Sequence, residues 1–194
     1  MRLFKSKKYS SLEELVKACQ RQDPSAQTAF YDLYKSKLLG ICFRYAKTGA
    51  EAEDIFQEAL IKVFKNLGEL KDINVVASWV KSIVIRTAIN YYNRTTKQEQ
   101  LNSCVDDITA EFKSEEHERI IDQMDMEVLL NVINSLPDGY RMVVNLYLID
   151  GFSHKEIGEF LHITESTSRS QFFKGRNLLI KKLEQKGITQ YEIS

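Results

Sequence analysis

The chain has 194 residues, and its 27 Lys and Arg balance its 27 Asp and Glu, so the total charge argues against a uniformly basic nucleic-acid binder. Only 8 Gly and 2 Pro are present, and apolar residues recur at helical rather than alternating spacing, which favours an all-helical protein over a sheet-based one. The 3 cysteines lack disulfide or zinc-ligand spacing, and no apolar stretch has signal-peptide or membrane-span length, so we expect a cytoplasmic protein with no cofactor and no membrane insertion.

The first two predicted helices each begin at a recognisable cap. Ser11 and Glu14 have the spacing of a capping box, which predicts a helix over residues 11–22. The pair Asp23-Pro24 is a second start signal, because proline lacks the N–H that would have no partner at the first helical position. We expect Thr48-Gly49 to end this second helix.

A third helix is predicted from the apolar stripe over residues 55–67. When its residues are plotted at about 100° each, the opposite face is acidic and contains one apolar residue, Ile61. An apolar residue with an acidic rim suits an interface with a basic partner. On spacing alone, an ordinary solvated helix face is the commoner explanation.

A fourth helix is predicted from about Val76 to Thr96, after a polar connection over residues 68–74. We assign Trp79 to the core of this part of the chain. The later part of the helix is aromatic and basic, with no acid among its successive cations Lys81, Arg86, Arg94 and Lys97.

Residues 98–118 lose the apolar periodicity and accumulate acids, which predicts a flexible acidic linker. The periodic pattern returns after residue 118. We therefore predict an all-α fold of two small helical domains, residues 1–97 and 119–194, joined by this linker.

The second domain contains a predicted helix-turn-helix. Ser153 and Glu156 form another capping box, which opens a short helix, and Thr164-Glu165 opens a long one directly after the turn at His162-Ile163. The long helix carries a local basic run, which matters more for phosphate binding than the total charge. This run consists of Arg169, Lys174, Arg176, Lys181, Lys182 and Lys186.

Three segments together resemble the sigma factors of bacterial RNA polymerase. Residues 50–67, "AEAEDIFQEALIKVFKNL", are similar to their second conserved region, and residues 79–94, "WVKSIVIRTAINYYNR", resemble the promoter-melting part that follows. Residues 136–183 resemble the fourth conserved region, which binds the minus-thirty-five element. Their order and the short chain resemble the extracytoplasmic-function subgroup.

The resemblance implies a protein that catalyses no chemistry and directs core RNA polymerase to promoter DNA. The first domain would bind the clamp helices of the largest polymerase subunit and the minus-ten element. The second would bind the minus-thirty-five element and the polymerase flap. Many members of the subgroup are held inactive by an anti-sigma factor, which is a further expected partner.

The same resemblance implies three sets of contact residues. The residues that match the polymerase-binding positions are Asp54, Gln57, Glu58 and Ile61. The minus-ten set, in which the loop over residues 70–74 captures a flipped base, is Lys71, Asn74, Arg86, Asn90 and Tyr91. The minus-thirty-five set is Thr167, Arg169, Ser170, Phe173, Lys174 and Arg176, with Thr167 and Arg176 placed for phosphates.

The chain departs from the family pattern at three positions of the helix-turn-helix. Ser168 stands where the family commonly has Val, which predicts a slightly looser core. Gln171 replaces an Arg that would contact phosphate, and His162 occupies a turn position usually held by Gly.

Two alternatives predict different behaviour. A dimeric helix-turn-helix regulator would bind two half-sites about one helical turn apart without polymerase, but this leaves the first domain unexplained. A signalling adaptor that binds only proteins would direct no transcription. The basic fourth helix and the basic helix of the second domain argue against the adaptor.

Overall fold

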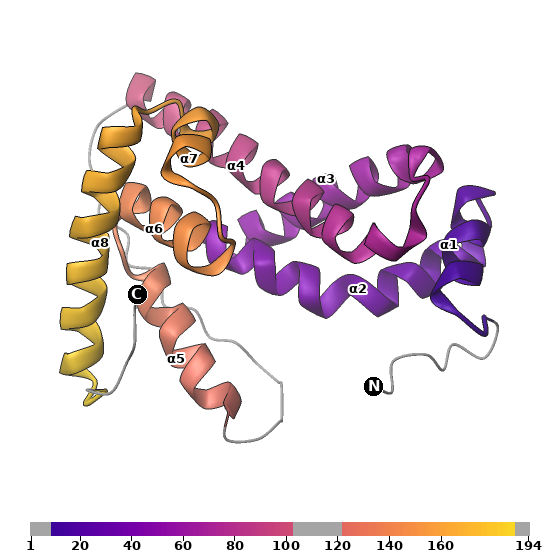
Figure 1. Ribbon diagram of the computed structural model, residues 1–194, viewed down its shortest axis with the longest axis horizontal. Coiled ribbons are helices and arrows are strands. Elements are labelled where there is room, and N and C mark those ends of the chain that lie inside the picture. Colours follow the sequence, from indigo (N-terminus) through magenta and orange to yellow (C-terminus); the bar gives the residue numbers. More distant parts are fainter. Residues whose placement is uncertain (1–8, 103–121, 189–194) are drawn as a thin grey trace. The chain divides into compact units, whose positions relative to one another are not determined.

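The computed structural model describes residues 9–102 and 122–188, and every regular element in these ranges is helical (Figure 1). The chain divides into two compact units, Met1–Tyr92 and Asn93–Ser194. The predicted all-α class is thus confirmed. Helix α4 continues to Asn102, and residues 103–118 of the predicted linker lie outside the described residues, so the linker stays a prediction.

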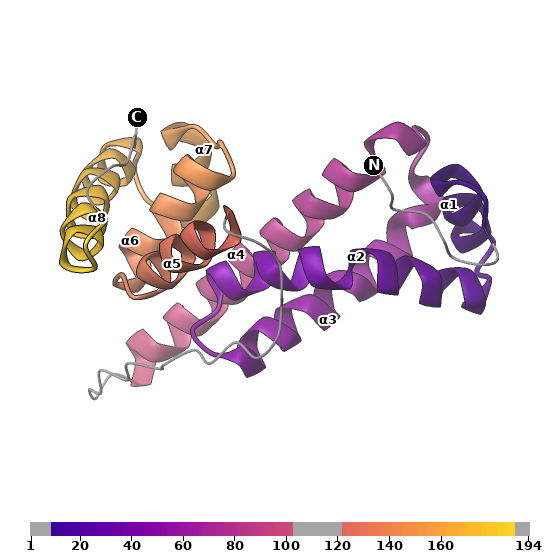
Figure 2. The same ribbon diagram turned by 90° about the horizontal axis from the view of Figure 1, so that it is seen from below.

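Helices α2 and α3 pack along each other in the first unit, as Figures 1 and 2 both show, and α1 packs against α2. The elements of this part of the chain are α1 (Leu12–Gln20), α2 (Pro24–Tyr45), α3 (Gly49–Asn66), the 3-10 turns η1 (Leu67–Glu69) and η2 (Ile73–Val75), and α4 (Val76–Asn102).

The predicted caps of α1 and α2 are confirmed. Ser11 Oγ accepts from the Glu14 amide at 3.1 Å, while the Glu14 carboxylate accepts from the amide of Ser10, one residue earlier than in a standard capping box. The Asp23 carboxylate accepts from the first amides of α2. These side chains satisfy N–H groups that have no partner inside the helix.

The expected end of the second helix was wrong. Helix α2 ends at Tyr45, because Ala46 leaves the helical conformation with a ψ of 155°. Thr48 then caps the next helix, since its hydroxyl accepts from the Glu51 amide at 3.2 Å. The Thr48-Gly49 pair therefore begins α3 and does not terminate α2.

The assignment of Trp79 to the core was also wrong. Val76, Val80 and Val84 share one face of α4, and all three are fully buried. Trp79 lies beside that face and is only half-buried. A narrow β-branched stripe, and not the large indole, fills the space against the neighbouring helices.

The second unit is built around α8, which contacts α5, α6 and α7. Its elements are α5 (Asp122–Asn134), α6 (Asp138–Val144), the π-helical segment η3 (Asn145–Ile149), α7 (His154–Leu161) and α8 (Glu165–Gln185). The core cluster consists of Val132, Ile133, Leu136, Val144, Leu179 and Leu183. Helices α7 and α8 confirm the predicted helix-turn-helix.

The turn between α7 and α8 adopts a left-handed conformation at His162, with a φ of 57° and a ψ of 40°. This is the conformation for which glycine is usually used, and histidine is among the residues that tolerate it best. Gly158 makes the turn tight, because an added Cβ there would lie 2.8 Å from the Ile163 carbonyl oxygen.

Gly175 lets α8 approach α6 closely. An added Cβ would lie 2.9 Å from Val144 Cγ2 and 3.0 Å from Tyr140 Cβ. We expect Gly175→Ala to lower the free energy of unfolding of the second unit by about 1–3 kcal/mol from overpacking, reduced by the higher helix propensity of alanine. Denaturation followed by circular dichroism measures this change.

Gly40→Ala is the matched control, because Gly40 lies in α2 with no atom within 4 Å of an added Cβ. It should raise the free energy of unfolding by about 0.5–1 kcal/mol. The single tryptophan lies in the first unit, so its fluorescence reports on that unit separately. Equal stabilisation by both substitutions would show that the close approach at Gly175 carries no constraint.

Candidate functional site

The outward face of α3 presents an isolated apolar side chain among polar ones. Ile61 is 69% exposed, and Asp54 and Gln57 beside it are exposed as well. Glu58 is half-buried. Lys62 Nζ donates to its carboxylate at 2.7 Å and also to Thr87 of α4 at 3.3 Å. The predicted polymerase-binding residues therefore share one surface, held against α4 through Lys62.

The connection between α3 and α4 is anchored from α1. The Gln20 side-chain amide donates to the carbonyl oxygens of Leu67 and Leu70, each at 3.1 Å. Within the connection, Asp72 Oδ1 accepts from the Asn74 amide at 2.9 Å and from Asn74 Nδ2 at 3.0 Å. The loop over residues 70–74 is thus fixed at its start and within itself.

The predicted minus-ten residues lie on this loop and on α4. Lys71, Asn74, Arg86 and Asn90 are exposed, and Tyr91 is half-buried. An open hollow of about 600 Å³ lies beside the start of the loop, lined by Asn66, Glu69, Leu70, Lys71, Trp79 and Ile83. The half-buried Trp79 thus forms part of a surface that sequence reasoning left out.

The predicted minus-thirty-five residues lie on α8, between Thr167 and Arg176. Arg169, Ser170, Phe173 and Lys174 are exposed, with Phe173 64% exposed. Arg169 donates to the Glu165 carboxylate at 2.6 Å. A second open hollow, of about 360 Å³, is lined by Tyr140, Ser166, Thr167, Ser170, Gln171 and Lys174.

Thr167 and Arg176, the two residues expected at phosphates, are half-buried. The Thr167 hydroxyl lies 2.8 Å from the Thr164 hydroxyl, which also caps α8 through the Thr167 amide at 3.0 Å. Thr167 therefore helps to fix the start of α8 besides facing the second hollow.

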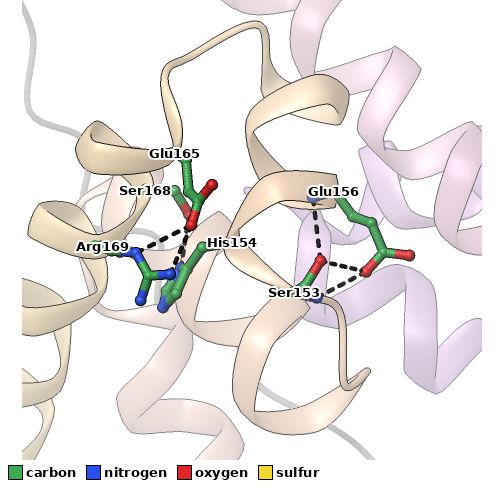
Figure 3. A network of polar contacts seen from close by, with 6 residues as sticks. All are labelled: Ser153, His154, Glu156, Glu165, Ser168 and Arg169. Atoms are coloured by element: carbon green, nitrogen blue, oxygen red, sulfur yellow. Dashed lines mark hydrogen bonds and ion pairs between the residues drawn. The ribbon is translucent and has the colours of Figure 1, made fainter.

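Sequence reasoning missed a polar contact inside the helix-turn-helix (Figure 3). His154 of α7 is 7% exposed, and its Nδ1 lies 3.0 Å from Ser168 Oγ of α8. The imidazole stacks on Tyr147 with ring centroids 4.4 Å apart. Ser168 is fully buried, and this contact gives its hydroxyl a hydrogen-bond partner on α7. The slightly looser core expected from a serine at this position stays a prediction.

Comparisons with known proteins match both halves of the chain. A family model described as "Sigma-70 region 2" matches residues 30–98, and another, "Sigma-70, region 4", matches residues 126–179, together more than half of the chain. The RNA polymerase sigma-H factor of Pseudomonas aeruginosa is 28% identical over 181 residues, 89% of this chain and 93% of that protein. The ECF RNA polymerase sigma-E factor of Escherichia coli is 27% identical over 180 residues, 88% of this chain and 93% of that protein.

The chain is a sigma-70 family sigma factor of the extracytoplasmic-function type. Among solved structures, the sigma factor RpoE in complex with the anti-sigma factor NepR, from Bartonella quintana, has the same fold, with a TM-score of 0.51 and 17% identity. The match covers 81% of this chain and 96% of that one. In this sigma factor, α3 and the loop fall within region 2, and α7 and most of α8 within region 4.

The stability of the helix-turn-helix of this sigma factor should depend on pH through His154. Burial lowers the pKa of His154 below its ordinary value of 6.5, and Arg169 acts in the same direction while Glu165 opposes it. Below about pH 6.5 the unfolded chain therefore binds more protons than the folded one, so the free energy of unfolding falls as the pH falls. Above about pH 6.5 the imidazole is neutral in both the folded and the unfolded chain, so His154 no longer makes the free energy of unfolding depend on pH.

Hydrogen exchange of α7 and α8 at about pH 5.5 and pH 7.5, corrected for intrinsic rates, measures this effect. His154→Phe keeps an aromatic ring against Tyr147 and should abolish most of the pH dependence, at some cost in stability from the unpaired Ser168 hydroxyl. His162→Gln, at the exposed turn, should leave the pH dependence intact. Equal pH dependence in wild type and His154→Phe would contradict the assignment.

The described ranges contain no group of three or more His, Cys, Asp or Glu that could hold a metal. Burial raises the pKa of the Cys19 thiol to about 11 and that of Cys42 to about 12. Both thiols therefore stay protonated at neutral pH, which makes them poor metal ligands and nucleophiles. No described helix is long and apolar enough to cross a membrane.

Proposed function

We propose that this sigma factor, which directs transcription by RNA polymerase, contacts the polymerase and both promoter elements through the three predicted residue sets. One observation carries the proposal. Within the described ranges, the large hydrophobic side chains that remain exposed are Ile61, Val75 and Phe173. Ile61 belongs to the polymerase set, Val75 directly follows the minus-ten loop, and Phe173 belongs to the minus-thirty-five set.

The α3 surface suits the clamp helices of the polymerase. Ile61 supplies an apolar group that binding can bury, and Asp54 and Glu58 supply an acidic rim that favours a basic partner and speeds association. The bond from Lys62 to Thr87 braces this surface against α4. Polymerase binding and promoter opening therefore use two helices that are directly linked.

The loop over residues 70–74 and the exposed side of α4 suit the minus-ten element. Asn74 and Asn90 carry amide groups that read base edges, and Arg86 and Lys71 supply positive charge for the backbone of the separated strand. Flipping a base costs a few kcal/mol. Trapping the unpaired base on the prepared loop offsets that cost, so opening needs no chemical step.

The first half of α8 suits the major groove at the minus-thirty-five element. Arg169 and Lys174 can donate to guanine edges, and the exposed ring of Phe173 can pack on a thymine methyl group. Arg176 lies further along the same helix and serves a phosphate. In the free protein the Arg169 guanidinium donates to the Glu165 carboxylate, one turn earlier on α8.

Binding to promoter DNA by the free protein should be weak, because each unit offers few phosphate contacts. Core polymerase fixes the separation of the two units and so raises the effective concentration of the second unit once the first is engaged. An anti-sigma factor that covers the α3 surface around Ile61 would prevent this assembly. The solved structure of the Bartonella quintana RpoE contains an anti-sigma factor, NepR.

Selection of bound sequences from a random duplex library, with the protein alone and with core polymerase, tests the proposal. We expect enrichment of a paired upstream and downstream element only when polymerase is present. Enrichment of a palindrome by the protein alone would favour the dimeric regulator. Polymerase binding without any enriched sequence would favour the adaptor.

A further inference from the structure

The orientation of the Asn74 side chain is fixed by its neighbour Asp72. The carboxylate can only accept hydrogen bonds, so the Asn74 group that faces it at 3.0 Å must be the NH2 group. The backbone amide of Asn74 donates to the same Asp72 oxygen at 2.9 Å, which holds both residues in one arrangement. The amide carbonyl, Asn74 Oδ1, is thereby left as an acceptor.

Two acceptor atoms are therefore displayed at the tip of the loop. Asp72 and Asn74 are both exposed. Within the described residues, Asp72 Oδ2 and Asn74 Oδ1 receive no hydrogen bond from the protein. One is the outer oxygen of a carboxylate and the other a neutral carbonyl, so both are suited to N–H donors.

These acceptors are in place before any ligand arrives. The two bonds from Gln20 hold the carbonyls of Leu67 and Leu70, which precede the tip of the loop. The bonds within Asp72 and Asn74 hold the tip itself. A loop that is already ordered loses less conformational entropy when it binds a ligand than a mobile loop would.

We propose that the base captured by this loop is one that carries an exocyclic amino group, and that thymine is rejected. Adenine, cytosine and guanine each carry an NH2 group, whose two hydrogens can meet two acceptors, whereas the only N–H donor on the pairing edge of thymine is N3–H, which lies between two carbonyl oxygens. If thymine donated this N3–H to one of the two acceptors, a thymine carbonyl oxygen would lie toward the other, and such an unpaired contact between acceptors disfavours thymine. This inference rests on the proposed function, in which the loop meets the minus-ten element.

In this arrangement Asn74 contacts the base, while Asp72 both accepts from it and positions Asn74. Asn74→Ala removes the neutral acceptor. Asp72→Ser removes the carboxylate but keeps a side chain that can cap η2, so the local fold is retained. Glu69→Ala is the control, because Glu69 is an exposed acid lining the neighbouring hollow and is outside the acceptor pair.

The experiment uses the full chain with core polymerase and templates randomised in the downstream element. One position should be depleted of thymine, and Asn74→Ala and Asp72→Ser should each relax the preference at that position alone, while Glu69→Ala should not. At that position, purine for adenine, pyrimidin-2-one for cytosine or inosine for guanine should slow initiation by roughly 5- to 150-fold in the wild type and much less in Asn74→Ala.

Thymine as the preferred base at the responsive position, or no position that responds to either variant, would overturn the inference while promoter-directed initiation persists. An unchanged rate with the amine-free bases would overturn it as well. Loss of all initiation that depends on the protein would be a different result, because it would contradict the proposed function itself.

Discussion

Ile61→Lys is expected to weaken the binding of this sigma factor to core RNA polymerase by about 30-fold or more. Residues at the well-packed, desolvated centre of an interface can cost about 2 kcal/mol or more when they are lost, and a buried unpaired ammonium adds a desolvation cost. Because Ile61 is 69% exposed in the free protein, the stability of the first unit should change little. Titration of labelled protein with core polymerase at fixed salt measures the affinity.

Two further variants separate the apolar contact from general surface effects. Ile61→Ala should weaken polymerase binding less than Ile61→Lys, because it removes the contact without adding a charge. Phe173→Ala removes a similarly exposed apolar side chain, at 64% exposure, from the second unit, and should leave the affinity for polymerase within about threefold. Unchanged binding by Ile61→Lys would show that the α3 surface is an ordinary solvated face.

Arg169→Ala is expected to relax the choice of base in the upstream promoter element. A guanidinium on a guanine edge contributes about 1–3 kcal/mol of discrimination, so initiation on the preferred template should fall by roughly 5- to 150-fold relative to templates mismatched at one position. Initiation rates on a set of templates that differ singly across the upstream element measure this loss.

Arg176→Ala provides the comparison, because a lost phosphate contact weakens all sequences alike and lowers the salt dependence by about one unit of slope. Glu165→Gln removes the ion pair that holds Arg169 and should leave both stability and base preference nearly unchanged, since exposed pairs contribute little. If Arg169→Ala lowered initiation equally on every template, Arg169 would be a phosphate contact and not a reader of bases.

Local signals in the sequence were enough to predict the helices and the helix-turn-helix. Side chains that satisfy amides within three residues, such as Ser11, Asp23 and Ser153, mark helix starts without reference to the rest of the fold. Local signals predict the wrong boundary at Thr48-Gly49, because this pair is a turn signal while its threonine is also a good N-cap. Helix α2 ends at Tyr45, three residues before Thr48. Only the extended backbone at Ala46 shows that α2 has ended before the Thr48-Gly49 pair begins the next helix.

Contacts between residues distant in the sequence were beyond this reasoning. Nothing local to Gln20 indicates that it binds carbonyls 47 and 50 residues away. His154 and Ser168 are 14 residues apart, and each alone would be an unfavourable polar residue in a core. The one signal in the sequence is that these two polar residues both occupy core-facing positions of the helix-turn-helix. Trp79 was misplaced because the packing of three valines, and not side-chain size, determines which face of α4 is buried.

The most direct test of the central claim is transcription in vitro from randomised promoter templates by core RNA polymerase, with and without this protein, followed by sequencing of transcript starts. We expect starts that appear only with the protein and share a paired upstream and downstream element. Absence of such starts, although the protein binds core polymerase, would contradict the assignment of promoter recognition to this chain.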